Sequence, residues 1–166
     1  MRKPLKQIDY CSEFHIEEIR KLTQTRSTYN SVCLHDLILD NCRKYPTKLA
    51  VRSFDGDLTY EALERFSRVL AHYIVDLGLR PEGFVLSSFQ KSTWAIVARL
   101  AILRAGGAYI SIHSSNPPAY LDSVIQRTDA RIMLSDASYA HRFYGIVERV
   151  ITITPSFLES LLPTRF

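Results

Sequence analysis

A glycine pair is the feature of this sequence that comes nearest to a ligand-binding motif. Gly106 and Gly107 lie between two apolar runs, and backbone N–H groups in a glycine-rich turn can bind phosphate when that turn opens a helix. Here the pair closes a helix-like run instead, so its N–H groups would not converge on an anion. We therefore interpret Gly106-Gly107 as a structural turn, in which glycine accepts the left-handed backbone of a helix exit.

The acidic and hydroxyl pairs also have structural interpretations. Asp55 and Asp57 could hold a metal ion, but Asp-Gly-Asp between apolar runs is typical of a hairpin turn. Ser87-Ser88 and Ser114-Ser115 could supply a nucleophile, yet neither pair has a base at a readable spacing. Since an unactivated hydroxyl is a weak nucleophile, we expect no nucleophilic catalysis from these serines.

The histidines and cysteines lack the spacing of a metal site. The five histidines form no H-x-x-x-H or H-E-x-x-H pattern, and only His113 lies at a predicted strand end, where α/β folds bind ligands. An ordinary loop histidine is the simpler alternative there. Cys11, Cys33 and Cys42 include no C-x-x-C pair, which predicts reduced thiols of a cytoplasmic protein. We assign no catalytic, cofactor-binding or metal-binding residue.

Apolar periodicity predicts the helices that position these residues. The clearest apolar stripe lies between Thr59, its predicted N-cap, and Gly78, its predicted C-cap. Asn116 is predicted to cap another helix, with Pro117 as its first residue. Further helical patterns cover residues 34–42, 92–104, 137–144 and 156–162.

Strand-like runs alternate with these helices. They cover residues 50–54, 84–87, 108–112, 131–135 and 147–153. Such alternation favours parallel βαβ units. We therefore predict an α/β fold with a partial parallel sheet and helices on both of its faces.

Bulk composition excludes several classes of function. The 166 residues are 46% hydrophobic and 23% charged, as in a soluble globular domain. The net charge of +4 comes from scattered basic residues, so we expect no nucleic-acid partner. No apolar signal sequence follows the N-terminus, and the longest apolar stretch, residues 94–103, is too short to span a membrane. We expect a cytoplasmic protein without membrane contact.

The N-terminal region is more polar than the rest of the chain. Residues 1–31 form a linker-like segment. The apolar residues between Phe14 and Leu22 predict one short helix within it, and residues 23–31, which follow this helix, are predicted to be the linker itself. The dense alternation of apolar segments begins at Val32. We therefore expect a domain over residues 32–166.

Two ordered segments resemble motifs of a known family. Residues 58–63 (LTYEAL) and residues 103–110 (LRAGGAYI) resemble the first two core motifs of adenylate-forming enzymes. The likeness is to adenylation domains of fungal non-ribosomal peptide synthetases. Residues 89–95 and 128–131 also fit, and residues 11–31 resemble the linker that follows a condensation domain. The resemblance implies that residues 32–166 are a truncated adenylation (AMP-binding) domain, the first part of its large N-terminal subdomain.

The chain departs from the family pattern after the second motif. Where the family continues Val-Pro-Leu-Asp-Pro, residues 110–114 read Ile-Ser-Ile-His-Ser, so that Ser111 and His113 replace proline and aspartate. Nothing after Asp136 resembles the Ser/Thr/Gly-rich loop with lysine that binds the ATP phosphates in the family. The family's substrate pocket, its ribose-binding aspartate and its lid lysine also have no counterpart here. The resemblance thus implies ATP and Mg²⁺ for the full-length family, and no cofactor for this chain.

Three functions remain open on the sequence alone. The first is a catalytically silent adenylation-domain fragment, from a protein of secondary metabolism whose full-length form activates an amino or aryl acid with ATP. That acid then passes to a carrier-protein thiol, so carrier proteins or other synthetase modules are the implied partners. The second is a non-catalytic binding or regulatory module derived from such a domain. The third, a complete small α/β enzyme of another family, would need a catalytic constellation that we do not find.

Overall fold

The computed structural model describes residues 11–23, 31–113 and 115–162. The chain divides into two units after Val32. In the first unit, helix α1 (Glu13–Thr23) has no buried residue, and its apolar side chains Phe14, Ile19 and Leu22 are exposed. Helix α1 lies where we predicted a short helix. Residues 24–30, most of the predicted linker, fall outside the described residues, so the division into residues 1–31 and 32–166 stays a prediction.

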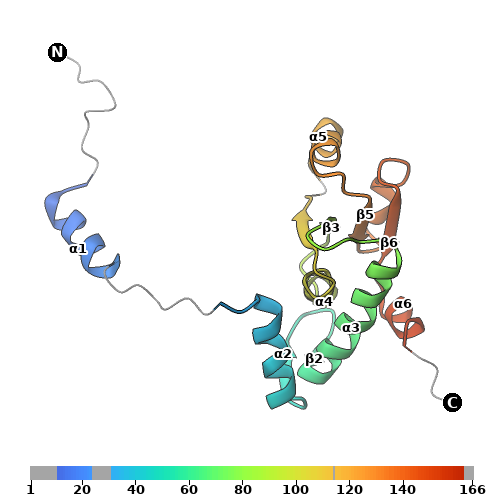
Figure 1. Cartoon of the computed structure of the whole chain (residues 1–166), viewed down its shortest axis with the longest axis horizontal. Coiled ribbons are helices and arrows are strands. Elements are labelled where there is room, and N and C mark those ends of the chain that lie inside the picture. The colour runs from blue at the N-terminus through green and yellow to red at the C-terminus, as the bar shows by residue number, and fades with distance from the viewer. Residues whose placement is uncertain (1–10, 24–30, 114, 163–166) are drawn as a thin grey trace. The chain divides into compact units, whose positions relative to one another are not determined.

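The second unit alternates helices and strands (Figure 1). Its helices are α2 (Leu34–Lys44), α3 (Tyr60–Asp76), α4 (Thr93–Arg104), α5 (Pro118–Thr128) and α6 (Pro155–Ser160), with a 3₁₀ turn η2 (Ala140–Arg142). Its strands are β1 (Leu49–Val51), β2 (Leu58–Thr59), β3 (Phe84–Ser88), β4 (Ala108–Ser111), β5 (Ile132–Ser135) and β6 (Arg149–Thr152).

The central sheet has four parallel strands in the order β4-β3-β5-β6. Helix α4 carries the chain from β3 to β4 on one side, and α5 returns it to β5 on the other side of β3. Strands β1 and β2 form a separate antiparallel pair. The predicted α/β fold with a partial parallel sheet is therefore confirmed.

Helices cover both faces of this sheet (Figure 1). On one face, side chains of α3, α4 and α6 bury the sheet residues Val85 and Leu134. On the other face, Leu121 of α5 and Phe143 pack against Leu86 and Met133. This arrangement follows from the strand order. The crossover from β3 to β4 and the crossover from β4 to β5 run in opposite directions across the sheet. Two crossovers of the same hand that run in opposite directions place their helices on opposite faces.

Local sequence explains the ends of α3. The Thr59 hydroxyl accepts a hydrogen bond from Ala62 N at 3.2 Å, as predicted for an N-cap. At the other end Gly78 has φ +94°, and Leu79 N donates to Ile74 O at 3.3 Å. Gly78 N also donates to Val75 O at 2.8 Å. This is a Schellman ending, in which the N–H of the left-handed residue and the N–H that follows it satisfy the last carbonyls of the helix.

Two predicted elements differ from the structure. Helix α5 begins at Pro118 with Pro117 as its cap residue, because the Asn116 side chain turns back and accepts from His113 N at 2.7 Å. The helix predicted over residues 137–144 is only the short turn η2. Its first turn is bonded to Asp136, and Gly145 (φ +79°) redirects the chain before a second turn can form.

Candidate functional site

The sheet has one position where neighbouring strands send the chain in opposite directions. From β3 the chain moves outward to β4, whereas from β5 it moves outward to β6, on the far side. In open parallel α/β sheets the carboxyl ends of such a strand pair form the usual ligand-binding crevice. In this sheet they carry Ser88, which pairs in register with Ser135, followed by Asp136.

Asp136 joins the loops that leave the two strands. One carboxylate oxygen, Oδ2, accepts from Gln90 N at 2.6 Å, and the other, Oδ1, accepts from Tyr139 N at 3.0 Å. Its own N–H donates to Ser88 O at 3.3 Å. A carboxylate that accepts two backbone N–H groups is fixed in position, so Asp136 holds the β3 and β5 loops in a set spacing.

Two buried serines lie beneath this carboxylate. The Ser135 hydroxyl donates to Ser88 O at 2.8 Å. The Ser88 side chain is 1% exposed, and its hydroxyl has no hydrogen-bond partner among the described residues. The polar groups at this edge can therefore orient backbone segments. Sequence reasoning missed Asp136 because its partner Gln90 comes from another loop, 46 residues away in the chain.

His113 follows strand β4 and contacts one of the predicted serines. Its Nδ1 lies 2.7 Å from Ser115 Oγ and accepts from Ser115 N at 3.2 Å. Our expectation that this serine pair has no base is thus wrong for Ser115. Both residues are exposed and only two positions apart, and a catalytic pair also needs a third group that orients the base. The described residues place no such group on Nε2, so the contact is that of a local turn.

The Gly106-Gly107 pair does not fit a nucleotide phosphate. Gly106 N donates to Leu103 O at 3.1 Å, and Gly107 N donates to Ile102 O at 3.0 Å. Both N–H groups are therefore consumed by a second Schellman ending, that of α4. A Cβ on Gly107 would lie 2.8 Å from a methyl group of Leu79, so close packing requires glycine here.

The amino end of α4 is filled from within the chain. Asp55 accepts from Thr93 N at 3.1 Å, and the Ser92 hydroxyl accepts from Ala95 N at 3.2 Å. A helix N-terminus attracts anions, and here the anion is the Asp55 carboxylate. Asp57 turns elsewhere, toward Ser53 N at 3.2 Å, so the two aspartates serve different partners rather than a shared metal ion. The Gly106-Gly107 turn and the amino end of α4 are thus both occupied by hydrogen bonds from within the chain.

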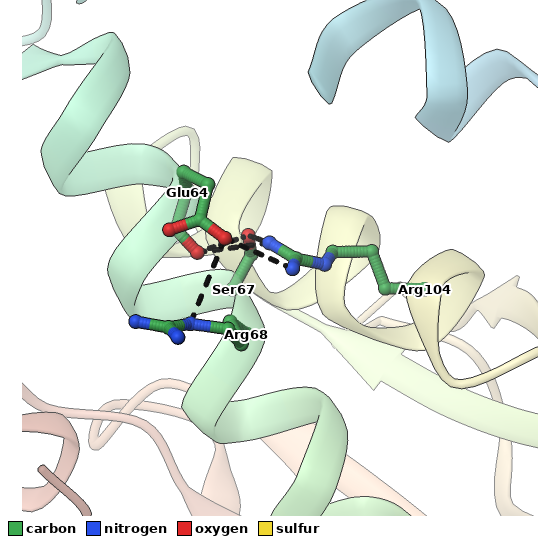
Figure 2. Close-up of polar contacts among 4 residues, drawn as sticks. All are labelled: Glu64, Ser67, Arg68 and Arg104. Atoms are coloured by element: carbon green, nitrogen blue, oxygen red, sulfur yellow. Dashed lines mark hydrogen bonds and ion pairs between the residues drawn. The ribbon is translucent and has the colours of Figure 1, made fainter. Parts of the chain in front are cut away.

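A part-buried ion pair joins α3 to α4 (Figure 2). The Arg104 guanidinium, 14% exposed, lies 3.1 Å from a Glu64 carboxylate oxygen. It also donates to Glu64 O and Ser67 Oγ, at 2.9 Å each. Arg68 approaches the same carboxylate from solvent, at 3.6 Å. The network lines a cavity of about 270 Å³ between α2, α3 and α4.

Cys42 lies beside that network. Burial raises the pKa of the Cys42 thiol, and the Glu64 carboxylate adds to the effect. The thiol is therefore protonated and unreactive at neutral pH. All three cysteines are free, and Cys11 and Cys33 are exposed.

A larger cavity of about 420 Å³ opens at the amino end of the sheet. Four of its five charged lining residues form ion pairs, and no ion pair is found for the fifth, Arg80, among the described residues. Arg131 pairs with Asp129 at 3.2 Å, and Arg149 pairs with Glu148 at 3.5 Å while donating to Leu77 O at 3.0 Å. Arg149 thereby caps the last turn of α3. We therefore assign this residue of the cavity lining a structural role, the stabilisation of the end of α3.

A third polar cluster lies at the start of α2. Cys33 Sγ, one ring nitrogen of His35 and one carboxylate oxygen of Asp36 all lie within 4.8 Å of one another. Sequence reasoning missed this group because it considered only paired-cysteine and paired-histidine patterns. The available signal was three donor residues at positions i, i+2 and i+3 of a helix start, which one helical turn brings together.

Fold and site together define an open, doubly wound α/β domain. Its polar edge lies at the β3–β5 switch point, the position where the chain leaves two neighbouring strands in opposite directions. Residues 38–160 match the family model of the AMP-binding enzymes. The chain belongs to this AMP-binding enzyme family, as the two sequence motifs indicated.

Fungal peptide synthetases are among its curated relatives. The chain is 35% identical over 162 residues to nonribosomal peptide synthetase 32 of Fusarium pseudograminearum, and 37% identical over 129 residues to nonribosomal peptide synthetase TES of Alternaria alternata. These alignments cover 98% and 78% of the chain but 2% of each relative. The chain thus spans a small part of the relatives it matches.

Solved structures share the fold. The nonribosomal peptide synthetase FmoA3, in its AMPPNP-bound form, superposes with a TM-score of 0.74 at 22% identity, over 88% of this chain and 16% of that one. VinN superposes with a TM-score of 0.73 at 20% identity, over 81% of this chain and 36% of that one. In the parts of the chain that the structure describes, no helix combines the length and the apolar character needed to cross a membrane.

Proposed function

We propose that this chain provides the opening part of the large subdomain of a peptide-synthetase adenylation domain. Such a domain activates an amino or aryl acid with ATP as an acyl-adenylate and passes it to a carrier-protein thiol. The observation that carries the proposal is the family match over residues 38–160, which spans all four strands of the parallel sheet.

Within that domain, these residues act as a scaffold. The sheet, together with the hydrogen bonds that the Asp136 carboxylate accepts, sets the positions of the loops at the carboxyl edge. The glycine pair and the amino end of α4 are already satisfied by internal hydrogen bonds. The contacts to ATP phosphates and Mg²⁺ are therefore assigned to other parts of the domain. A cytoplasmic location, with carrier-protein and other synthetase modules as partners, belongs to the same proposal.

Amino-acid-dependent ATP–pyrophosphate exchange tests the catalytic half of this proposal. The purified 166-residue chain is expected to show no exchange above a no-enzyme blank, because internal hydrogen bonds already occupy the glycine pair and the amino end of α4. An intact adenylation domain, assayed in parallel, is the positive control. Exchange by the chain alone would contradict the scaffold role.

A chimera tests the positive half. Residues 38–160 replace the aligned segment in the adenylation domain of the Fusarium relative, and exchange is measured with that domain's own substrate. A scaffold segment is expected to keep the host's substrate preference and measurable exchange. A chimera that folds cooperatively but has lost exchange would show that this segment does not support the host's site.

A further inference from the structure

We propose that Cys33, His35 and Asp36 form a binding site for a divalent transition-metal ion, with zinc as the natural occupant. The three donor atoms lie within 4.8 Å of one another, and His35 Nε2 is 3.7 Å from Asp36 Oδ1. This inference is independent of the proposed adenylation role, because the cluster lies at the start of α2 and shares no residue with the switch point.

The donor set matches the chemistry of zinc. Thiolate sulfur, imidazole nitrogen and carboxylate oxygen are its three common protein ligands, and three such ligands leave a fourth tetrahedral position for water. Thiolate and imidazole together favour zinc over magnesium or calcium, which prefer oxygen ligands. One thiolate and one carboxylate also balance the double positive charge of the ion.

The geometry needs little adjustment. Ligand bonds of about 2.0–2.3 Å in a tetrahedron place donors roughly 3.3–3.8 Å apart. The 3.7 Å between His35 and Asp36 already fits this range, and a pair at the upper limit of 4.8 Å would have to close by about 1–1.5 Å. The side chains are free to make that change, because Cys33 is exposed and the Asp36 side chain is 56% exposed. The His35 side chain, at 26%, is the more fixed member.

The backbone already holds the three residues in one turn. Asp36 N donates to Cys33 O at 3.1 Å, and Leu37 N donates to the same carbonyl at 3.4 Å. Cys33 is the N-cap residue of α2, yet its side chain makes no capping hydrogen bond, so its sulfur is available as a ligand. A bound ion would fasten the first turn of α2.

Titration with cobalt tests the site directly. Co²⁺ is added to the 166-residue chain in a buffer with a non-thiol reductant, and absorbance reports the thiolate-to-cobalt charge-transfer band and the tetrahedral d–d bands. We expect one equivalent to bind and Zn²⁺ to displace it. Cys33→Ser is expected to abolish the charge-transfer band, and His35→Gln and Asp36→Asn each to weaken binding by about tenfold or more.

Matched controls separate this site from other donors. Cys11→Ser removes the other exposed thiol, and Asp40→Asn removes a carboxylate further along α2 that pairs with Arg43 at 2.7 Å. Both variants should bind cobalt as the unaltered chain does, and circular dichroism confirms that each variant is folded. Absence of the band, its persistence in Cys33→Ser, or full affinity in both His35→Gln and Asp36→Asn would overturn the proposal.

Discussion

Asp55 stabilises the first turn of α4 from a loop 38 residues earlier in the chain, through Thr93. Its carboxylate accepts the Thr93 backbone N–H at 3.1 Å and lies 3.1 Å from the Thr93 hydroxyl, which is also 2.7 Å from Gly56 O. The loop between β1 and β2 is thereby attached to the helix that packs on the central sheet.

This contact predicts an acid-sensitive contribution to stability. Burial raises the pKa of the Asp55 carboxyl, but hydrogen bonds from Ser53 and Thr93 outweigh it and hold the pKa below its ordinary value. A lowered pKa in the folded state means that the ionised group stabilises folding above about pH 4, and that this stabilisation is lost as the pH falls through the lowered pKa. Asp55→Asn should lower the free energy of unfolding by about 1 kcal/mol at about pH 7.

Urea denaturation followed by circular dichroism, at about pH 7 and about pH 3, measures this effect. The difference between Asp55→Asn and the unaltered chain should shrink at the lower pH. Asp122→Asn, an exposed position on α5, should change stability little at either pH. A pH-independent loss in Asp55→Asn would argue against the charged hydrogen bond.

The Glu64 carboxylate offers an internal comparison between a part-buried and an exposed arginine (Figure 2). Arg104→Ala should lower the free energy of unfolding by about 2 kcal/mol, because it removes the part-buried guanidinium that pairs with the Glu64 carboxylate and donates to Glu64 O and Ser67 Oγ. Arg68→Ala should change it by less than about 0.5 kcal/mol, as is usual for a solvent-exposed pair. Equal losses in the two variants, measured by urea denaturation, would show that burial does not govern this network.

The two glycines after α4 should respond differently to asparagine. Gly106 has φ +76°, and a Cβ there would make only an ordinary contact, at 3.9 Å from Pro81 Cα, so the backbone conformation alone should make Gly106→Ala cost about 1–2 kcal/mol. Gly106→Asn should cost less, because asparagine tolerates the left-handed backbone. At Gly107 a Cβ would lie 2.8 Å from the Leu79 side chain and 3.1 Å from Gly83 O, so both Gly107→Ala and Gly107→Asn should destabilise. Thermal melts of all four variants compare the positions, and rescue by asparagine at Gly107 would contradict this assignment.

The serines beneath Asp136 form another matched pair. Ser88→Ala removes a buried hydroxyl that has no partner among the described residues, so stability should stay within about 0.5 kcal/mol or rise. Ser135→Ala removes the hydrogen bond to Ser88 O and should cost about 1 kcal/mol. A larger loss in Ser88→Ala than in Ser135→Ala, by urea denaturation, would mean that the Ser88 hydroxyl has an essential partner.

Local patterns in the sequence were sufficient for α3 but not for the site. The apolar stripe and caps of α3 depend on residues within a turn or two of one another. Thr59 was therefore predicted correctly as the N-cap, and Gly78 ends the helix as predicted, although it lies one residue after the C-cap residue Leu77. The partner of Asp55 could not be predicted from local patterns. An Asp-Gly-Asp turn was visible in the sequence, whereas its attachment to Thr93 depends on how distant segments pack.

Strand order was beyond the sequence for a similar reason. All four residues of β5 are buried, so its composition has no alternation to distinguish one neighbour or one face from another. The switch point, and with it the role of Asp136, emerges only when β5 is placed beside β3. The His113–Ser115 contact and the Cys33 cluster likewise depend on side-chain directions in a turn.

The strand order also has a consequence for how the chain acquires its structure. Strand β3 pairs with β4 and β5, and β5 pairs with β6, so each described strand of the central sheet pairs with the next strand in the chain or the one after it. A nascent chain emerges from its N-terminal end, so each of these pairings needs only strands that follow one another closely in strand order. The sheet can therefore grow during synthesis, strand by strand from β3, without waiting for a remote segment.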